Sequence, residues 1–162
     1  MTTDSGAQDE TSGTALHYTY LAALQQDNVE LPIDTWIVGV VNMQIYGFGN
    51  AVDTNFECLG PPDDLFDEFR DARNSLESGW MSNVEAHNCA WGQLAFEFRY
   101  LRYLHTGWQE DTDIRNACDA ILEGLQERPV ALVCYEGDKK FCHRTVLKRF
   151  LTSKHQPTHN NG

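Results

Sequence analysis

Two short and almost purely apolar segments constrain the fold more than any other feature of the sequence. Residues 35–41 (TWIVGVV) and 129–135 (PVALVCY) are rich in β-branched side chains and lack alternating polar positions. This pattern is typical of strands that are buried on both faces, as in a parallel sheet covered by helices. Amphipathic segments lie between and after them, which indicates an α/β fold. We therefore predict a single three-layer α/β domain with a small, mainly parallel sheet flanked by helices.

Helical periodicity and capping signals define the segments between the strands. A helix opens at Pro61-Pro62 and ends at Gly79, and residues 82–85 (SNVE) have the form of a capping box. One continuous helix is expected after this box, with a buried face made of Val84, Trp91, Leu94, Ala95, Phe98 and Leu101. A third helix begins near Asp111 or Thr112, and a last one near Cys142 or His143. Residues 18–24 fit a strand or a helix, and residues 42–55 are expected to form a loop.

Length and composition indicate one domain. A chain of 162 residues is of ordinary size for a single domain, which we place at residues 14–152 between disordered tails at 1–13 and 153–162. There is no run of 18 or more apolar residues, so no membrane contact is expected. The first residues do not resemble a signal peptide, which favours a cytoplasmic protein.

The charge of the chain is large and unevenly distributed. The formal net charge is −12, and the acidic residues are spread along the chain, as suits a salt-adapted (halophilic) cytoplasm. This excess argues against binding of nucleic acid or anionic lipid. From residue 139 to the end there is no Asp or Glu, and the basic residues there are Lys139, Lys140, Arg144, Lys148, Arg149 and Lys154. A small anionic ligand is therefore the expected partner near this segment; no oligomeric state is specified.

The five cysteines are odd in number and scattered, so we expect reduced thiols rather than a disulfide framework. Cys58, Cys89 and Cys118 are predicted to be core or near-core thiols, because free cysteine behaves as a small hydrophobic side chain.

Residues 134–144 carry the candidate site. Cys134 and Glu136 follow a buried strand, and Cys142, His143 and Arg144 open the next helix. Ligands of open α/β sheets bind beyond the carboxyl ends of the strands, where helix N-termini supply free N–H groups. Such a position lowers the pKa of a thiol, and Arg can hold an oxyanion through two hydrogen bonds. Lys139, Lys140 and Asn42, which follows the first strand, are further candidates for substrate binding.

The same stretch resembles the C-terminal signature of the proteins grouped as domain of unknown function 488, also called YeaO-like. That signature is a hydrophobic strand, Cys-x-Glu, a short polar loop and Cys-His-Arg, and residues 132–136 (LVCYE) and 142–145 (CHRT) match it. Residues 37–39 look like the family's opening strand, whereas its aspartate-arginine pair is not recognisable here. Residues 85–88 and Trp91 are similar to a segment of acidic, haloarchaeal-type members. The resemblance implies an α/β fold and no particular activity.

Three functions compete for this site. The first is a thiol enzyme acting on a nucleotide, a phosphoester or a sulfur compound, with Cys134 or Cys142 as nucleophile, Glu136 or His143 moving protons and Arg144 holding the anion. The second is a zinc or iron site made by Cys134, Cys142 and His143, completed by Glu136 or His87. The third is a nucleic-acid module that uses the basic helix. Each residue also has a purely structural interpretation, in packing or ion pairing. We favour the enzyme because the five side chains converge at one favoured place.

Overall fold

The computed structural model describes residues 15–45 and 47–155. The predicted tail at 1–13 lies outside this part of the chain, as do residues 156–162 of the second tail. Ser153 and Lys154, which we had placed in that tail, complete a helix instead.

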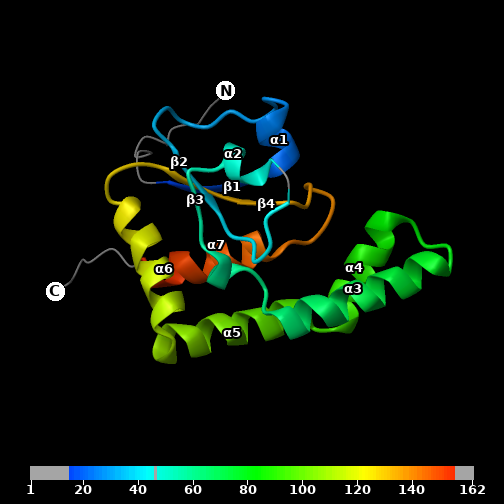
Figure 1. Cartoon of the computed structure of the whole chain (residues 1–162). Coiled ribbons are helices and arrows are strands. Elements are labelled where there is room, and N and C mark those ends of the chain that lie inside the picture. The colour runs from blue at the N-terminus through cyan, green and yellow to red at the C-terminus, as the bar shows by residue number, and fades with distance from the viewer. Residues whose placement is uncertain (1–14, 46, 156–162) are drawn as a thin grey trace, which may run out of the picture.

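The described residues form a four-stranded parallel sheet with helices on both faces, which confirms the predicted three-layer α/β fold (Figure 1). The strand order is β1 (Leu16–Tyr20), β4 (Val130–Cys134), β2 (Trp36–Gly39) and β3 (Thr54–Asn55). The two apolar segments of the sequence are the central strands, and Val38 is in register with Leu132. Every residue of β4 is buried, because the strand has neighbours on both edges and helices on both faces.

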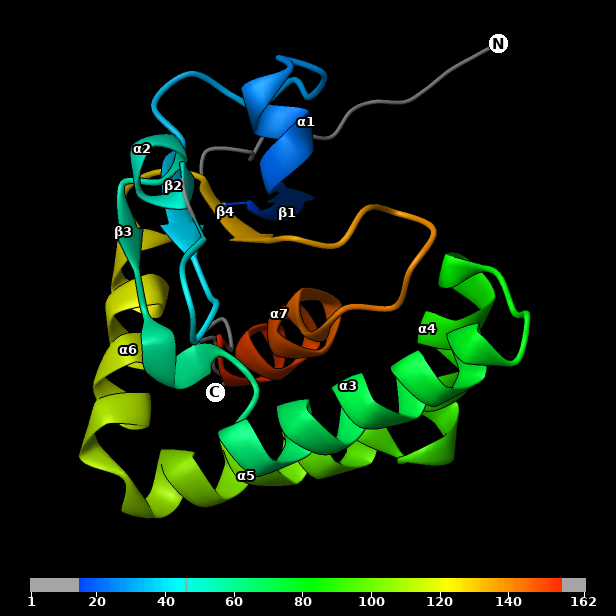
Figure 2. The same ribbon diagram turned by 45° about the vertical axis from the view of Figure 1, so that its right-hand side comes forward.

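Short helices cover one face of the sheet and long helices cover the other (Figures 1 and 2). Helices α1 (Leu21–Gln25) and α2 (Phe48–Ala51) lie on the first face. Helix α7 (His143–Lys154) lies on the second, and α3 (Asp63–Ser78) and α5 (Phe96–Glu110) pass outside it. Helix α6 (Thr112–Gly124) returns the chain to β4. The main core is enclosed by β2, β4, α5, α6 and α7.

Two ambiguous segments are more structured than predicted. Residues 18–24, for which a strand and a helix were both possible, contain one of each: β1 ends at Tyr20 and α1 begins at Leu21. Residues 42–55 were expected to be a loop, but they contain α2 and the edge strand β3. Strand β3 has only two residues, and a short 3-10 helix at Glu57–Leu59 follows it. Elements this short do not produce a recognisable hydrophobic periodicity in the sequence.

The single helix predicted after Ser82 is wrong, because the chain breaks into α4 (Asn83–Gln93) and α5. Ala95 adopts a left-handed backbone conformation with φ of 50°, which ends one helix and redirects the next. The buried face changes with it: Phe98 is 62% exposed, whereas Phe96 and Tyr100 are buried. The Ser82 capping box at the start of α4 is confirmed.

The other predicted helix ends are confirmed. Gly79 caps α3. The carboxylate of Asp111 accepts hydrogen bonds from the N–H groups of Asp113 and Ile114 at the start of α6. Cys142 is the N-cap of α7. Among the described residues, none of the helices combines the length and the apolar character that crossing a bilayer requires.

Candidate functional site

A cavity of about 220 Å³ lies beyond the carboxyl ends of β2 and β4. Its walls come from three parts of the chain: residues 41–45 after β2, side chains of α4, the start of α5 and α3 with the preceding Pro61, and residues 134–136 and 141–143. Of the predicted site residues, Asn42, Cys134, Glu136, Cys142 and His143 line it. The cavity therefore lies at the carboxyl edge of the sheet, the place at which the sequence analysis put the candidate site.

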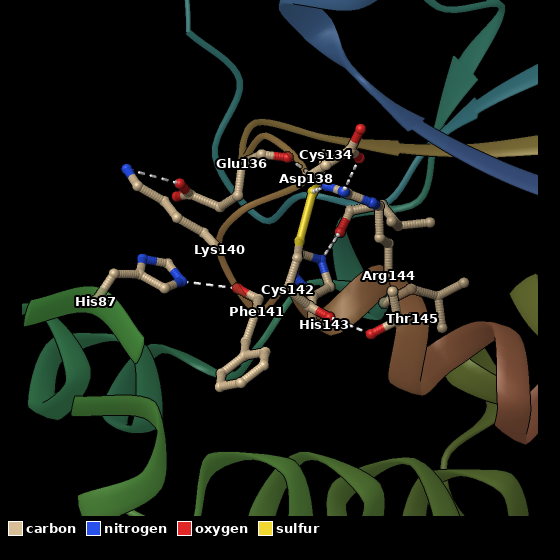
Figure 3. The surroundings of a disulfide bond; sticks show 12 residues. His87, Cys134, Glu136, Asp138, Lys140, Phe141, Cys142, His143, Arg144 and Thr145 are labelled. Carbon is tan, nitrogen blue, oxygen red and sulfur yellow. Dashed lines mark hydrogen bonds and ion pairs between the residues drawn. A yellow bond between two sulfur atoms is a disulfide. The ribbon is translucent and has the colours of Figure 1, made fainter. Parts of the chain in front are cut away.

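Cys134 and Cys142 meet at this cavity, and the structure joins them as a disulfide with Cα atoms 7.8 Å apart (Figure 3). The expectation that all the cysteines are reduced is wrong for these two. It failed because residues eight apart in sequence come from a strand end and a helix start that face each other. Cys58, Cys89 and Cys118 are free, as predicted. Burial raises the pKa of the Cys118 thiol to about 12, so this thiol is inert at neutral pH.

The buried side chain of Arg144 contacts the cysteine pair from behind. One of its terminal guanidinium nitrogens, Nη1, donates to the sulfur of Cys134 at 2.8 Å and to the carbonyl oxygen of Glu136. The other end lies 3.4 Å from the carboxylate of Asp138. Burial lowers the pKa of Arg144, and the nearby Asp138 carboxylate opposes this.

Arg144 does not line the cavity, so it does not occupy the position predicted for a residue that holds the substrate. Its guanidinium is turned toward the rings of Tyr18 and Tyr20, 5.2 and 5.8 Å from their centroids. A positive charge held against a sulfur atom stabilises the thiolate form of that cysteine. Arg144 is thus placed to act on Cys134.

His143 lies beside the other cysteine and is also buried. Its Nε2 lies 2.6 Å from the carbonyl oxygen of Val40, and its Nδ1 lies 3.6 Å from the sulfur of Cys142. Because a carbonyl oxygen only accepts hydrogen bonds, Nε2 carries the proton and Nδ1 has its lone pair toward the sulfur. Burial lowers the pKa of His143 to about 4, so the ring is neutral at pH 7.

The other predicted polar residues are engaged at the margin of the site. The Glu136 carboxylate pairs with the Lys140 ammonium group at 3.3 Å, and Lys139 is exposed. Neither lysine lines the cavity. The side-chain amide of Asn42 donates to the carbonyl oxygen of Pro61 and to the carboxylate of Asp63, which attaches the end of β2 to the start of α3.

Helix α4 holds the loop that carries Cys142. His87 donates from Nε2 to the carbonyl oxygen of Phe141 at 2.7 Å. The Asn88 side chain donates to the carbonyl oxygen of Lys139 and accepts from the N–H group of Phe141. Figure 2 shows this loop reaching from the end of β4 to α4. Burial lowers the pKa of His87, which favours the neutral ring in this contact.

Tyr135 supports the opposite wall. Its hydroxyl donates to the carbonyl oxygen of Met43 at 2.6 Å and accepts from the N–H group of Ile45 at 2.7 Å. The residue directly after Cys134 therefore fixes the segment that follows β2. Burial raises the pKa of the Tyr135 hydroxyl, so it remains a donor at neutral pH.

The metal alternative gains no support from the side-chain arrangement. Within residues 15–45 and 47–155, no three His, Cys, Asp or Glu side chains are grouped as metal ligands. His87 was offered as a fourth ligand, but its Nε2 is engaged by Phe141. The Nε2 of His143 is likewise engaged by Val40.

Sequence reasoning missed Asn88, Tyr135 and Asp138 as parts of the site. For Tyr135 a signal existed, since it lies between the two motif residues Cys134 and Glu136. Asn88 belongs to the segment 85–88 that resembles haloarchaeal-type members, but that resemblance does not indicate its contact with a loop about fifty residues later in the chain.

Among protein-family models, the chain matches one described as the active DUF488-N3 subclade over residues 20–155. The match covers all the strands except the first residues of β1, and all the residues of the site. No curated protein and no solved structure matches the chain.

Proposed function

The chain belongs to the DUF488 family, and on that premise we propose that it is a thiol enzyme whose reacting group is the Cys134–Cys142 pair. One observation carries the proposal. The two sulfurs meet at the cavity, with the guanidinium of Arg144 on one of them and the Nδ1 of His143 on the other. Paired cysteines at a strand end and a helix N-terminus suit reversible thiol–disulfide chemistry. The substrate class that fits is the sulfur-containing one, a small disulfide.

Cys134 is the attacking residue in this proposal. In the reduced protein its thiolate is stabilised by Arg144, whereas the Cys142 thiol donates its hydrogen to the Nδ1 of His143. The Cys134 thiolate attacks one sulfur of the substrate disulfide, and a mixed disulfide forms as the other sulfur leaves as a thiolate. The leaving thiolate takes the proton of Cys142. The Cys142 thiolate then attacks the sulfur of Cys134 and releases the second half of the substrate.

The electrons balance in this sequence. The Cys134 thiolate and the Cys142 thiol are oxidised to the disulfide, which is the bond in the structure, and the substrate disulfide is reduced to one thiol and one thiolate, which takes its proton from water. A small thiol or dithiol reductant returns the protein to the dithiol. Because its pKa is about 4, His143 is a weak base, so its role is to orient the Cys142 thiol.

A negatively charged group of the substrate, as expected from the sequence, would lie at the mouth of the cavity. Among the described residues that line the cavity, Glu136 supplies the one carboxylate and there is no lysine or arginine, so a negative group would be repelled inside. Lys139 and Lys140 lie on the loop just outside. A negative group of the substrate would interact with these two lysines.

The test is the reaction of the reduced protein with bis(2-hydroxyethyl) disulfide, followed by mass spectrometry of the cysteine peptides. We expect the Cys134–Cys142 disulfide to form at least ~10-fold faster than mixed disulfides form at Cys58 or Cys89. Cys142→Ser should trap the mixed disulfide on Cys134. If Cys134→Ser retains the fast phase, or if all the cysteines react alike, the assignment fails.

A further inference from the structure

Aromatic rings form the inner wall of the cavity. The ring of Trp91 stacks on that of Phe96 with centroids 4.3 Å apart and an interplanar angle of 17°. Phe69 meets Phe96 edge-on at 5.4 Å, and Phe141 closes the group at 5.9 Å from Trp91. These side chains come from α3, α4, α5 and the loop before α7, and all of them line the cavity. The site is thus faced by ring edges and ring faces on the side away from the sheet.

The mouth of the cavity carries apolar side chains that remain in contact with water. Met43 is 68% exposed, Ile45 52% and Phe141 54%, and all three line the cavity. Tyr135 and Asn88 hold the backbones of these residues in place. A ligand that covers these fixed apolar side chains removes them from water, and this burial favours binding.

The size and chemistry of the space limit what can enter. A volume of about 220 Å³ is below the usual range of about 300–1,000 Å³ for pockets that hold drug-sized ligands. Arg144 points away from the cavity, and Lys140 is paired with Glu136 outside it. Among the described residues, the lining therefore consists mainly of aromatic and aliphatic side chains and the two sulfurs, with the Glu136 carboxylate at its margin and no lysine or arginine.

We propose that this cavity binds a single aromatic ring of the substrate, so that the thiol pair acts selectively on small aryl-bearing compounds. The inference rests on the proposed function for its chemistry and adds the substrate class. A ring inserted beside Trp91 and Phe96 makes offset-stacked or edge-on contacts with their rings. An aliphatic group of equal size cannot make these contacts. The sulfur attached to such a ring would then lie next to the cysteine pair.

The reactive test compares two alkylating agents that differ by one ring, iodoacetamide and N-phenyl iodoacetamide. Reduced Cys142→Ser protein is treated with each, and the alkylation rate of Cys134 is divided by the rate for free glutathione. We expect this normalised rate to be ~10-fold or more higher for the phenyl compound. Phe141→Ala should lower the preference, whereas Phe98→Ala, at another exposed phenylalanine that does not line the cavity, should leave it unchanged.

The unreactive pair acetanilide and acetamide separates the two proposals. Acetanilide should shift the NMR signal of the Met43 methyl group in a saturable way, and acetamide should not. If acetanilide binds but no cysteine reacts rapidly, ring binding stands and the thiol enzyme fails. If Cys134 reacts rapidly without preference for the phenyl compound and acetanilide produces no shift, the enzyme stands and ring binding is overturned.

Discussion

The Nε2–H group of His143 donates to the carbonyl oxygen of Val40 at 2.6 Å, which ties the start of α7 to the end of β2. This one bond determines which ring nitrogen faces Cys142. It also buries an imidazole that must stay neutral, because the cationic ring would lose its hydration.

Stability should therefore fall as the pH drops through the range in which His143 titrates. The pKa is about 4 in the folded protein and 6.5 for an ordinary histidine, so the unfolded chain binds more protons between these values. The contribution of the neutral ring is present above pH 6.5 and is lost toward pH 4. We expect the free energy of unfolding in urea to fall by about 2 kcal/mol from pH 7 to pH 5 on account of this residue.

His143→Gln provides the reference for that measurement, since the Gln amide can still donate to Val40 but does not titrate. Between pH 7 and pH 5, the free energy of unfolding of the variant should fall by about 2 kcal/mol less than that of the wild type. The same slope in both proteins would show that His143 does not carry it, and would leave His87 and His17, whose pKa values are also lowered by burial, as sources.

Arg144→Gln should raise the pKa of the Cys134 thiol. The guanidinium nitrogen lies 2.8 Å from the sulfur, and loss of its charge removes the main stabilisation of the thiolate. In the Cys142→Ser background we expect the alkylation rate at pH 7 to fall ~10-fold or more, with the loss recovered at higher pH. Arg149→Gln on the exposed side of α7, where Arg149 pairs with Glu97, is the matched control and should have no effect. An unchanged pH profile in Arg144→Gln would contradict the role of Arg144.

Tyr135→Phe should loosen the wall formed by residues 43–45. The hydroxyl makes one hydrogen bond as donor and one as acceptor, and their loss should cost about 1–2 kcal/mol of stability. The specific sign is faster hydrogen exchange of the Ile45 amide, which loses its acceptor. Tyr18→Phe, a change of the same size at a half-exposed strand position, should leave that exchange rate unaltered. Full protection of Ile45 in Tyr135→Phe would rule out this support.

Gly60→Ala should destabilise the protein by about 2 kcal/mol. A Cβ atom at residue 60 would collide with the backbone of Asn42, which lines the cavity and cannot move without shifting the end of β2. Gly92→Ala is the control, because a Cβ there meets no atom within 4 Å and the position is in α4. That change should stabilise by about 0.5–1 kcal/mol. Equal thermal midpoints for the two variants would show that the contact at Gly60 is not tight.

Much of the fold was predictable because its signals are local. The apolar runs of β2 and β4 and the caps at Ser82 and Asp111 depend on neighbouring residues alone. The break at Ala95 was not predictable, since residues 94–98 favour helix and Ala is not a residue that prefers a left-handed backbone. The stacking of Trp91 on Phe96 across this break is one packing contact that accompanies it.

The sequence by itself determined where the candidate site lies and that Cys134, Glu136, Cys142 and His143 come together there. Cys134 ends a central strand and Cys142 begins the next helix, and parallel topology brings those two ends to one edge of the sheet. Only the tertiary structure decided what the residues do there. It turned Arg144 onto a sulfur and brought the rings of α3, α4 and α5 to the same opening, because side-chain direction follows from packing between segments far apart in the chain.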